Sequence, residues 1–391
     1  MNIPVTIAAS YEMRPGRYPE LGAFDVFREL LRGAIREWEI TPQLVDGLLT
    51  SPGGQAQGQT DAYVHDKLVA ELGLRPRFAE TMCLGGASFG AMVNRAMSAI
   101  REGRANAVLC VGAGKFLKPT EGSAEMLAKV IAEADFEVPY GPFIPGLYAL
   151  IAKRFMHERN ITREDLARVA VSARKWALLN PDARMYGKGE LTIEDVIASR
   201  PIAEPFHYLD CSIPSDGGGA ILVTRAELGR ELSKQPAYVL GYGEYHPCGT
   251  ISSAGDLVET GAVRTGKEAF AEAGLTPQDI DVAQLYDAFS ATPLILLENL
   301  GFCAPGMSGK FVQSGAADPG GSLPMNTFGG LLSFGHTGDS SGMSVLIEGV
   351  KQAMGTAGDR QVADVEASLV HCYGGMMYDH ITLILGREPR A

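Results

Sequence analysis

The feature that most constrains the fold is a short pattern that recurs in the two halves of the chain. Residues 40–49 (ITPQLVDGLL) are echoed by residues 275–285 (LTPQDIDVAQL). Each segment follows an amphipathic helical stretch and leads into an apolar run of strand length. A helical pattern that opens on small residues comes later in each half, after Cys83 and at 340–354. Two echoes in the same order predict a duplicated α/β unit.

Helical and strand patterns alternate within the first half. Residues 23–40 have apolar residues at helical spacing, and residues 105–114 (ANAVLCVGAG) resemble a buried parallel strand. Such alternation predicts βαβ units around a sheet. We expect an N-terminal half at 1–235 and a C-terminal half at 236–391. An irregular stretch at about 115–205 is predicted to be a loop domain inserted over the first half, where it would build the substrate site.

Composition narrows the class of protein. The 391 residues are 46% hydrophobic, and the formal net charge is −12. A chain with this charge lacks the basic field of a general nucleic-acid or membrane-surface binder. The six cysteines include no CxxC pair, which argues against a zinc site in this chain. With no leader-like start and no apolar run of transmembrane length, we expect a cytoplasmic protein with free thiols.

Three residues in glycine-rich segments are candidates for chemistry. Cys83 precedes Gly85–Gly86 and a helical pattern, where a helix N-terminus would lower the pKa of a nucleophilic thiol. His336 lies between a glycine and a glycine-rich turn and could accept a proton. Cys372 precedes Gly374–Gly375 in a related turn of the second half. The alternatives are a buried structural cysteine and a histidine that only caps a turn.

Five segments resemble, in order, those of a thiolase-superfamily enzyme, closest to the sterol-carrier-protein type. They are CLGGASFGAMVNRAMSAIREGRANAVLCVGAGK, EPFHYLDCSIPSDGGGAILVT, YDAFSATPLILLENLGFC, NTFGGLLSFGHTGDSSG and CYGG. The resemblance covers nearly the whole chain. It implies an α/β protein with the thiolase fold, a duplicated five-layer αβαβα arrangement with an inserted loop domain.

The resemblance also implies roles for individual residues. Cys83 matches the nucleophile that carries the acyl group, and His336 matches the histidine that activates it. Cys372 matches the thiol that moves the proton of the α-carbon. The backbone N–H groups of Cys83 and Gly375, together with Asn326, are the expected donors to the thioester oxygen.

Three positions depart from the family pattern. Tyr286 stands where asparagine or histidine is usual, Ala288 where a cysteine is often found, and Thr337 where proline is usual. A tyrosine in this loop resembles thiolase-like aldolases that cleave β-hydroxyacyl-CoA. The leading prediction is CoA-dependent thiolysis of a 3-oxoacyl-CoA through an acyl-enzyme on Cys83. The alternatives are a retro-aldolase that uses Tyr286 and His336, and an inactive scaffold or lipid-binding subunit.

The substrate and partners are also predicted. Tyr286, Phe328 and Phe334 suggest a bulky, branched or aromatic acyl chain, as in the benzoylsuccinyl-CoA thiolase kind, although plain core packing explains these aromatic residues equally well. Coenzyme A would be the co-substrate, and its phosphates need cations. The candidates in the insertion are Arg174, Lys175, Arg184 and Lys188. The resemblance also implies a homodimer, for which residues 105–114 are the candidate pairing surface, and a small partner protein with a zinc ribbon and an OB-fold.

Overall fold

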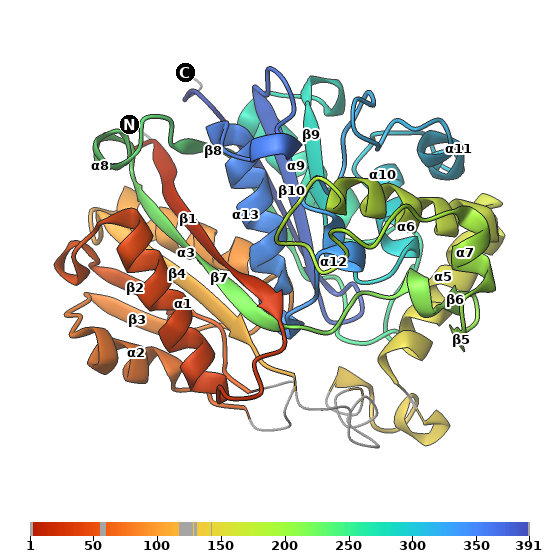
Figure 1. Ribbon diagram of the computed structural model, residues 1–391, viewed down its shortest axis with the longest axis horizontal. Coiled ribbons are helices and arrows are strands. Elements are labelled where there is room, and N and C mark those ends of the chain that lie inside the picture. Colours follow the sequence, from red (N-terminus) through yellow and green to blue (C-terminus); the bar gives the residue numbers. More distant parts are fainter. Residues whose placement is uncertain (1–2, 55–59, 117–127, 129–130, 142, 390–391) are drawn as a thin grey trace.

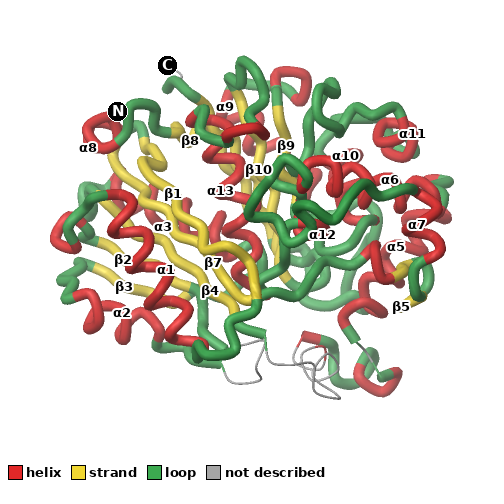
Figure 2. Tube along the Cα trace, viewed as in Figure 1, coloured by secondary structure: helices red, strands yellow, loops and turns green. Residues whose placement is uncertain are grey.

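Nine strands form one mixed sheet in the order β3-β2-β4-β7-β1-β8-β11-β10-β9 (Figures 1 and 2). The computed structural model describes residues 3–54, 60–116, 128, 131–141 and 143–389. The strands of the sheet are β1 (Val5–Gly16), β2 (Gly47–Thr50), β3 (Phe78–Thr81), β4 (Ala107–Gly114), β7 (Asp216–Arg225), β8 (Ala237–Tyr245), β9 (Val282–Leu285), β10 (Ala367–Gly374) and β11 (Asp379–Gly386). A separate hairpin pairs β5 (Pro201–Ala203) with β6 (Phe206–His207).

Helices cover both faces of the sheet (Figure 1). The helices with described bounds are α1 (Ala23–Trp38), α2 (Val64–Leu72), α3 (Ser88–Arg101), α5 (Ile144–Arg159), α6 (Arg163–Ala177), α7 (Ile193–Ala198), α8 (Ala226–Leu232), α9 (Ala262–Ala273), α10 (Ala291–Asn299), α11 (Ser308–Gln313), α12 (Gly330–Ser333) and α13 (Ser341–Met354). Among the described residues, none of these helices is long and apolar enough to span a membrane.

The sheet repeats itself about its centre, where β1 and β8 pair over two residues. In the first half β4 pairs with β2 in parallel and with β7 antiparallel, and in the second half β10 pairs with β9 and β11 in the same two ways. The echoed segments lie in equivalent places, because each forms a short 3-10 turn that leads into β2 or β9. The duplicated α/β fold is therefore confirmed. The boundary at residue 235 stays a prediction.

One aspartate in each echo explains why the pattern recurs. Asp46, before β2, accepts the N–H of Asn106 at 2.9 Å, at the start of β4. Asp281, before β9, accepts the N–H of Ala367 at 2.9 Å, at the start of β10. Each carboxylate thus fixes the register of two neighbouring parallel strands.

Two helices form the central layer. Helices α3 and α13 pack against each other, and each also contacts strands of both halves of the sheet. Their small residues allow close approach: a Cβ added to Gly342 would collide with the carbonyl of Gly86, and one added to Gly90 would press on Ile381. The helices α1 and α2 cover the opposite face of the first half, and α9 covers that of the second. This layering brings the loops at the ends of α3 and α13 together.

The predicted dimer surface is wrong. Residues 107–114 form β4, which lies between β2 and β7 and is buried along almost its whole length. An apolar run of this kind occurs both in interior strands and in strands at a subunit interface. The edge at β9 is covered, since Ala283 pairs with the backbone of Pro324 and Asn326. The other edge strand is β3, and the homodimer itself stays a prediction.

The described helices of the insertion pack on the second half of the chain, whereas they were predicted to lie over the first. Its helices α5 and α6 pack on α10, α11 and α12 of the second half (Figure 1). Trp176 donates its indole N–H to the carbonyl of Ala317 at 2.9 Å, and Lys175 pairs with Asp318 at 2.6 Å. These contacts with residues far along the chain hold the insertion beside the loops that carry Tyr286 and His336.

Candidate active site

Cys83 lies in the loop between β3 and α3, and its side chain is exposed. Helix α3 begins only at Ser88, so turns rather than the first helical turn surround the thiol. The hydroxyl of Ser88 accepts the N–H of Leu84 at 2.8 Å and donates to the carbonyl of Gly85 at 2.7 Å. This side chain holds the loop in one shape beside Cys83.

The loop of Cys83 packs against the turn between β10 and β11. A Cβ on Gly85 would lie 3.1 Å from Gly374 Cα and 3.2 Å from Gly375 N, and one on Gly374 would collide with the carbonyl of Leu84. Gly85 and Gly375 both have positive φ, of 53° and 55°, which glycine adopts without strain. The glycines after Cys83 and Cys372 thus let two loops from different halves touch, as a site shared between the halves requires.

Tyr286 and His336 form the central contact of the site. Tyr286 follows β9, and its ring lies so close to Gly86 that a Cβ there would collide with it. The Tyr286 hydroxyl lies 3.0 Å from His336 Nε2, and the two rings meet edge-on with centroids 6.0 Å apart. The backbone N–H of His336 is bound to the carbonyl of Ile213 at 2.7 Å. Both side chains are therefore fixed by the loops around them.

The surroundings of His336 determine its tautomer and charge. The N–H of Gly338 donates to His336 Nδ1 at 3.2 Å, so the proton of the neutral ring lies on Nε2. His336 Nε2–H then donates to the Tyr286 oxygen. Burial lowers the pKa of His336 to about 4, because the imidazolium loses its hydration. At neutral pH the site holds an uncharged imidazole whose N–H can stabilise negative charge on Tyr286.

The lowered pKa of His336 predicts the acid side of the pH profile. Protonation of Nδ1 would break the bond from Gly338, and it begins only as the pH falls toward about 4. We expect kcat/KM to show no fall between pH 7 and pH 5.5, and a fall toward pH 4. Steady-state rates across this range test the prediction. A fall in kcat/KM with its midpoint near pH 6.5, the ordinary histidine value, would contradict the prediction if the same fall disappears in a His336 variant.

Cys372 is buried on β10. Its Sγ lies 3.7 Å from the carbonyl of Gly342, and burial raises the pKa of the thiol strongly. Because side chains alternate along a strand, the next residue, Tyr373, faces the other way and packs 4.8 Å from the ring of Tyr286. The proton-transfer role of Cys372 stays a prediction, and the raised pKa makes this thiol a weak acid.

Asn326 stabilises the loop after β9, and its role as a donor to the thioester oxygen stays a prediction. Its Oδ1 accepts the N–H of Leu285 at 2.7 Å. Asp287 was missed by the sequence analysis. It is fully buried, accepts the N–H of Leu331 at 2.8 Å, and has a pKa that burial raises to about 8. Asp287 bridges the loops of Tyr286 and His336. The sequence feature that could have indicated this role is an acidic residue directly after Tyr286 within an apolar run.

The four predicted CoA-binding cations divide into two pairs. Arg174 is buried and donates to the carbonyl of Gly189 at 3.2 Å, and Lys175 is paired with Asp318. Arg184 and Lys188 have exposed side chains. The backbone of Arg184 bonds the carbonyl of Phe334 at 2.9 Å, two residues before His336. The CoA-binding role of all four cations stays a prediction.

The aromatic residues expected to line an acyl site lie in the core instead. Phe328 and Phe334 are 1% and 2% exposed, and they pack edge-on with ring centroids 5.3 Å apart. Core packing, the alternative interpretation, describes both. Within the described part of the chain, no group of three or more histidine, cysteine or acidic side chains is arranged to hold a metal ion.

Comparisons with known proteins identify the family. Residues 7–191 match the family model of the thiolase N-terminal domain, and residues 243–387 match that of the thiolase C-terminal domain-like family. The chain belongs to the thiolase superfamily. It is a sterol-carrier-protein-type member, as the sequence motifs predict.

Relatives of this thiolase-superfamily protein carry out two kinds of reaction. It is 35% identical to the steroid side-chain-cleaving aldolase of Thermomonospora curvata over 92% of each chain. It is 32% identical to the benzoylsuccinyl-CoA thiolase subunit BbsB of Thauera aromatica, over 76% of this chain and 75% of that one. The solved structure of an Ltp2-ChsH2(DUF35) aldolase matches with a TM-score of 0.84 and 31% identity over 98% of each chain. The superfamily member is an acyltransferase or a related lyase.

Proposed function

We propose that this thiolase-superfamily protein cleaves the bond between the α- and β-carbons of a β-hydroxyacyl-CoA by a retro-aldol reaction. Tyr286 Oη–H gives its proton to the α-carbon as the bond breaks, and the same oxygen, which becomes negatively charged, takes the β-hydroxyl proton as the carbonyl forms. The electron pair of the broken bond passes to the α-carbon, which takes the proton of Tyr286. The products are an aldehyde or ketone and a shortened acyl-CoA, and no other reactant is consumed.

The contact between Tyr286 and His336 carries this proposal. Since His336 Nε2–H donates to the Tyr286 oxygen, it stabilises charge that develops there while the proton is in transit. The contact needs neither cysteine. The Gly375 N–H is the proposed donor to the thioester oxygen, beside the Cys83 loop. The similarity to two aldolases over most of the chain also supports this reading.

Cys83 favours a second candidate function, the thiolysis of a 3-oxoacyl-CoA. Its thiol is exposed in a loop whose glycines touch Gly375 and the Tyr286 ring. In that reaction Cys83 takes the acyl group, and free CoA then releases it. The α-carbon must receive a proton, and the burial of Cys372 makes this thiol a poor donor. The retro-aldol reaction is therefore the one that the geometry supports better.

Cys83→Ser separates the two reactions. We expect the variant to keep retro-aldol kcat/KM within about fivefold of the parent, because Tyr286 and His336 are unchanged. Thiolysis would lose its nucleophile and with it the acyl-enzyme. The test measures both reactions in both proteins and looks for an acylated Cys83 by mass spectrometry. Retro-aldol activity that disappears with Cys83 would contradict the proposal.

A partner subunit is a further part of the proposal. The name of the solved aldolase structure joins two proteins, Ltp2 and ChsH2(DUF35). We extend this to the present chain and propose a small partner with a zinc ribbon and an OB-fold that completes the CoA site. This proposal fits the four predicted cations: Arg174 already donates to the carbonyl of Gly189 and Lys175 already pairs with Asp318, which leaves Arg184 and Lys188 of the four.

A further inference from the structure

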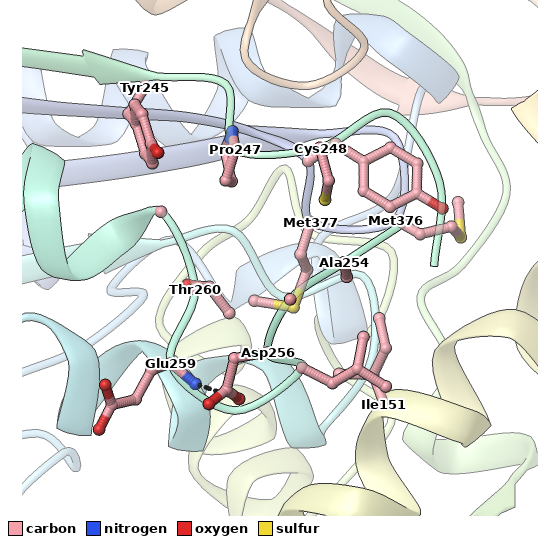
Figure 3. Close-up of a pocket in the computed structure, with 14 residues that line it drawn as sticks. Ile151, Tyr245, Pro247, Cys248, Ala254, Asp256, Glu259, Thr260, Met376 and Met377 are labelled. Carbon is pink, nitrogen blue, oxygen red and sulfur yellow. Dashed lines mark hydrogen bonds between the residues drawn. The ribbon is translucent and has the colours of Figure 1, made fainter. Parts of the chain in front are cut away.

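A pocket of about 380 Å³ lies beside the turn that carries Gly375. One wall is formed by residues of the segment between β8 and α9, and the other by Met376, Met377 and Tyr378 of the turn between β10 and β11. Ile151 of α5 completes the wall. Figure 3 shows the Met377 side chain between Cys248 and Asp256, so the turn reaches into the middle of the pocket.

The pocket and the candidate active site share this turn. Met376 directly follows Gly375, the carbonyl of which accepts the Tyr148 hydroxyl at 2.8 Å. Tyr148 and Ile151 lie one turn apart on α5, so the same helix contacts the turn and lines the pocket. Gly375 itself lies against Gly85 in the Cys83 loop. A group in the pocket would therefore lie one short turn away from Gly375, the proposed donor to the thioester oxygen.

The lining selects against charged ligands and for apolar ones. Asp256 and Glu259 are acidic and stand at the pocket, so they repel the phosphates of CoA. Asp256 is already occupied by the N–H groups of Val258 and Glu259 at 2.7 and 3.0 Å. Beside these two acids lie apolar and sulfur-containing side chains, and methionines adapt to the shape of a ligand. The apolar ones are Ile151, Leu257, Met376 and Met377.

The wall opposite the turn is held in place. His246 lies 2.6 Å from Asp379, the first residue of β11, and 3.0 Å from Glu244 on β8. Burial disfavours the charge of His246, but the bonds to the two carboxylates outweigh it and raise the pKa. His246 thus joins both walls at one end of the pocket, and the space is formed without a ligand.

We propose that this pocket binds the end of the acyl chain, and that the protein acts on CoA thioesters whose acyl part ends in a ring-sized, uncharged apolar group. The inference rests on the proposed function, since it assumes that the thioester lies at Gly375. A volume of about 380 Å³ falls in the range of small-molecule sites and far exceeds the need of a two- or three-carbon chain. The bulky end of the acyl chain would then lie in this pocket and not beside Phe328 and Phe334.

A filling substitution and a matched control test the pocket. Gly255 lines it, whereas Gly249 of the same segment does not; a Cβ at either position meets nothing within 4 Å. Gly255→Phe therefore puts a ring into the pocket without disturbing the fold, and Gly249→Phe puts one outside it. Binding constants are measured for 3-phenylpropanoyl-CoA and butanoyl-CoA, which lack a β-oxygen and cannot be cleaved by either candidate reaction. Thermal unfolding checks that both variants fold.

We expect the wild type to bind 3-phenylpropanoyl-CoA more tightly than butanoyl-CoA. Gly255→Phe should weaken the binding of 3-phenylpropanoyl-CoA at least about tenfold, because the phenyl ring of the ligand loses its apolar burial. The affinity for butanoyl-CoA should change less than about twofold. Gly249→Phe should change neither. Equal weakening of both ligands by Gly255→Phe, or no preference in the wild type, would overturn the inference. Because the assay measures binding alone, the pocket can be confirmed even if the proposed cleavage is absent.

Discussion

We expect Tyr286→Phe to lower kcat/KM for the proposed retro-aldol cleavage by about 10²- to 10⁴-fold, the range that one acid–base group contributes. The variant removes the oxygen that meets His336 Nε2 at 3.0 Å and keeps the ring that covers Gly86. Folding should therefore change little, since the apolar contact remains. Steady-state kinetics on a β-hydroxyacyl-CoA give the loss, and thermal unfolding checks the fold.

Tyr373→Phe is the matched control for this variant. Tyr373 is a buried tyrosine that packs 4.8 Å from the ring of Tyr286, and its hydroxyl makes no bond to His336. We expect a change in kcat/KM of less than about fivefold, which is small beside the effect of an acid–base group. Equal losses in the two tyrosine variants would show that packing, rather than proton transfer, explains the effect of Tyr286→Phe.

We expect His336→Leu to lower kcat/KM for the same reaction by about 10²- to 10³-fold, the loss that follows when one donor to a developing charge is removed. Leucine has a similar volume but no N–H to stabilise charge on Tyr286. His336→Gln should recover part of the activity, because its side-chain amide offers an N–H from a similar position. A leucine variant as active as the glutamine variant would mean that His336 only fills space.

The double variant provides a further check. Because His336 acts through the oxygen of Tyr286, removing both groups should cost little more than removing Tyr286 alone. Additive losses in Tyr286→Phe with His336→Leu would indicate that the two side chains act on different atoms of the substrate.

The duplicated fold could be predicted from local pattern. The echoed segments each hold an aspartate, Asp46 or Asp281, whose bonds fix two strands, so the constraint lies within a few residues and is visible in the sequence. The meeting of the Cys83 and Gly375 loops was implied by the family resemblance, and the structure gives its physical reason, because the two backbones approach too closely for side chains at Gly85 and Gly374.

Features that depend on distant residues could not be predicted. The side on which the insertion packs is decided by Ala317 and Asp318, more than 100 positions from the helix that they bind. The burial of β4 depends on its neighbours β2 and β7, and an apolar run alone cannot distinguish an interior strand from an interface. In the same way, the sequence around Cys372 does not reveal that Gly342 covers its thiol.

The tautomer of His336 illustrates the same limit at the scale of one atom. Sequence motifs identify the histidine as a candidate, but its role depends on which ring nitrogen carries the proton. That follows from the bond between Gly338 N–H and Nδ1, and from the burial that keeps the ring neutral. The choice between the two candidate reactions therefore rests on geometry rather than on motif.

Product analysis in D₂O tests the central claim most directly. The protein, with its partner subunit if one copurifies, is incubated with a β-hydroxyacyl-CoA in the absence of free CoA. Retro-aldol cleavage predicts an aldehyde or ketone and a shortened acyl-CoA that carries deuterium at its α-carbon, in the wild type and in Cys83→Ser alike. No cleavage of this substrate, together with CoA-dependent cleavage of a 3-oxoacyl-CoA and an acylated Cys83, would contradict the account and establish thiolysis instead.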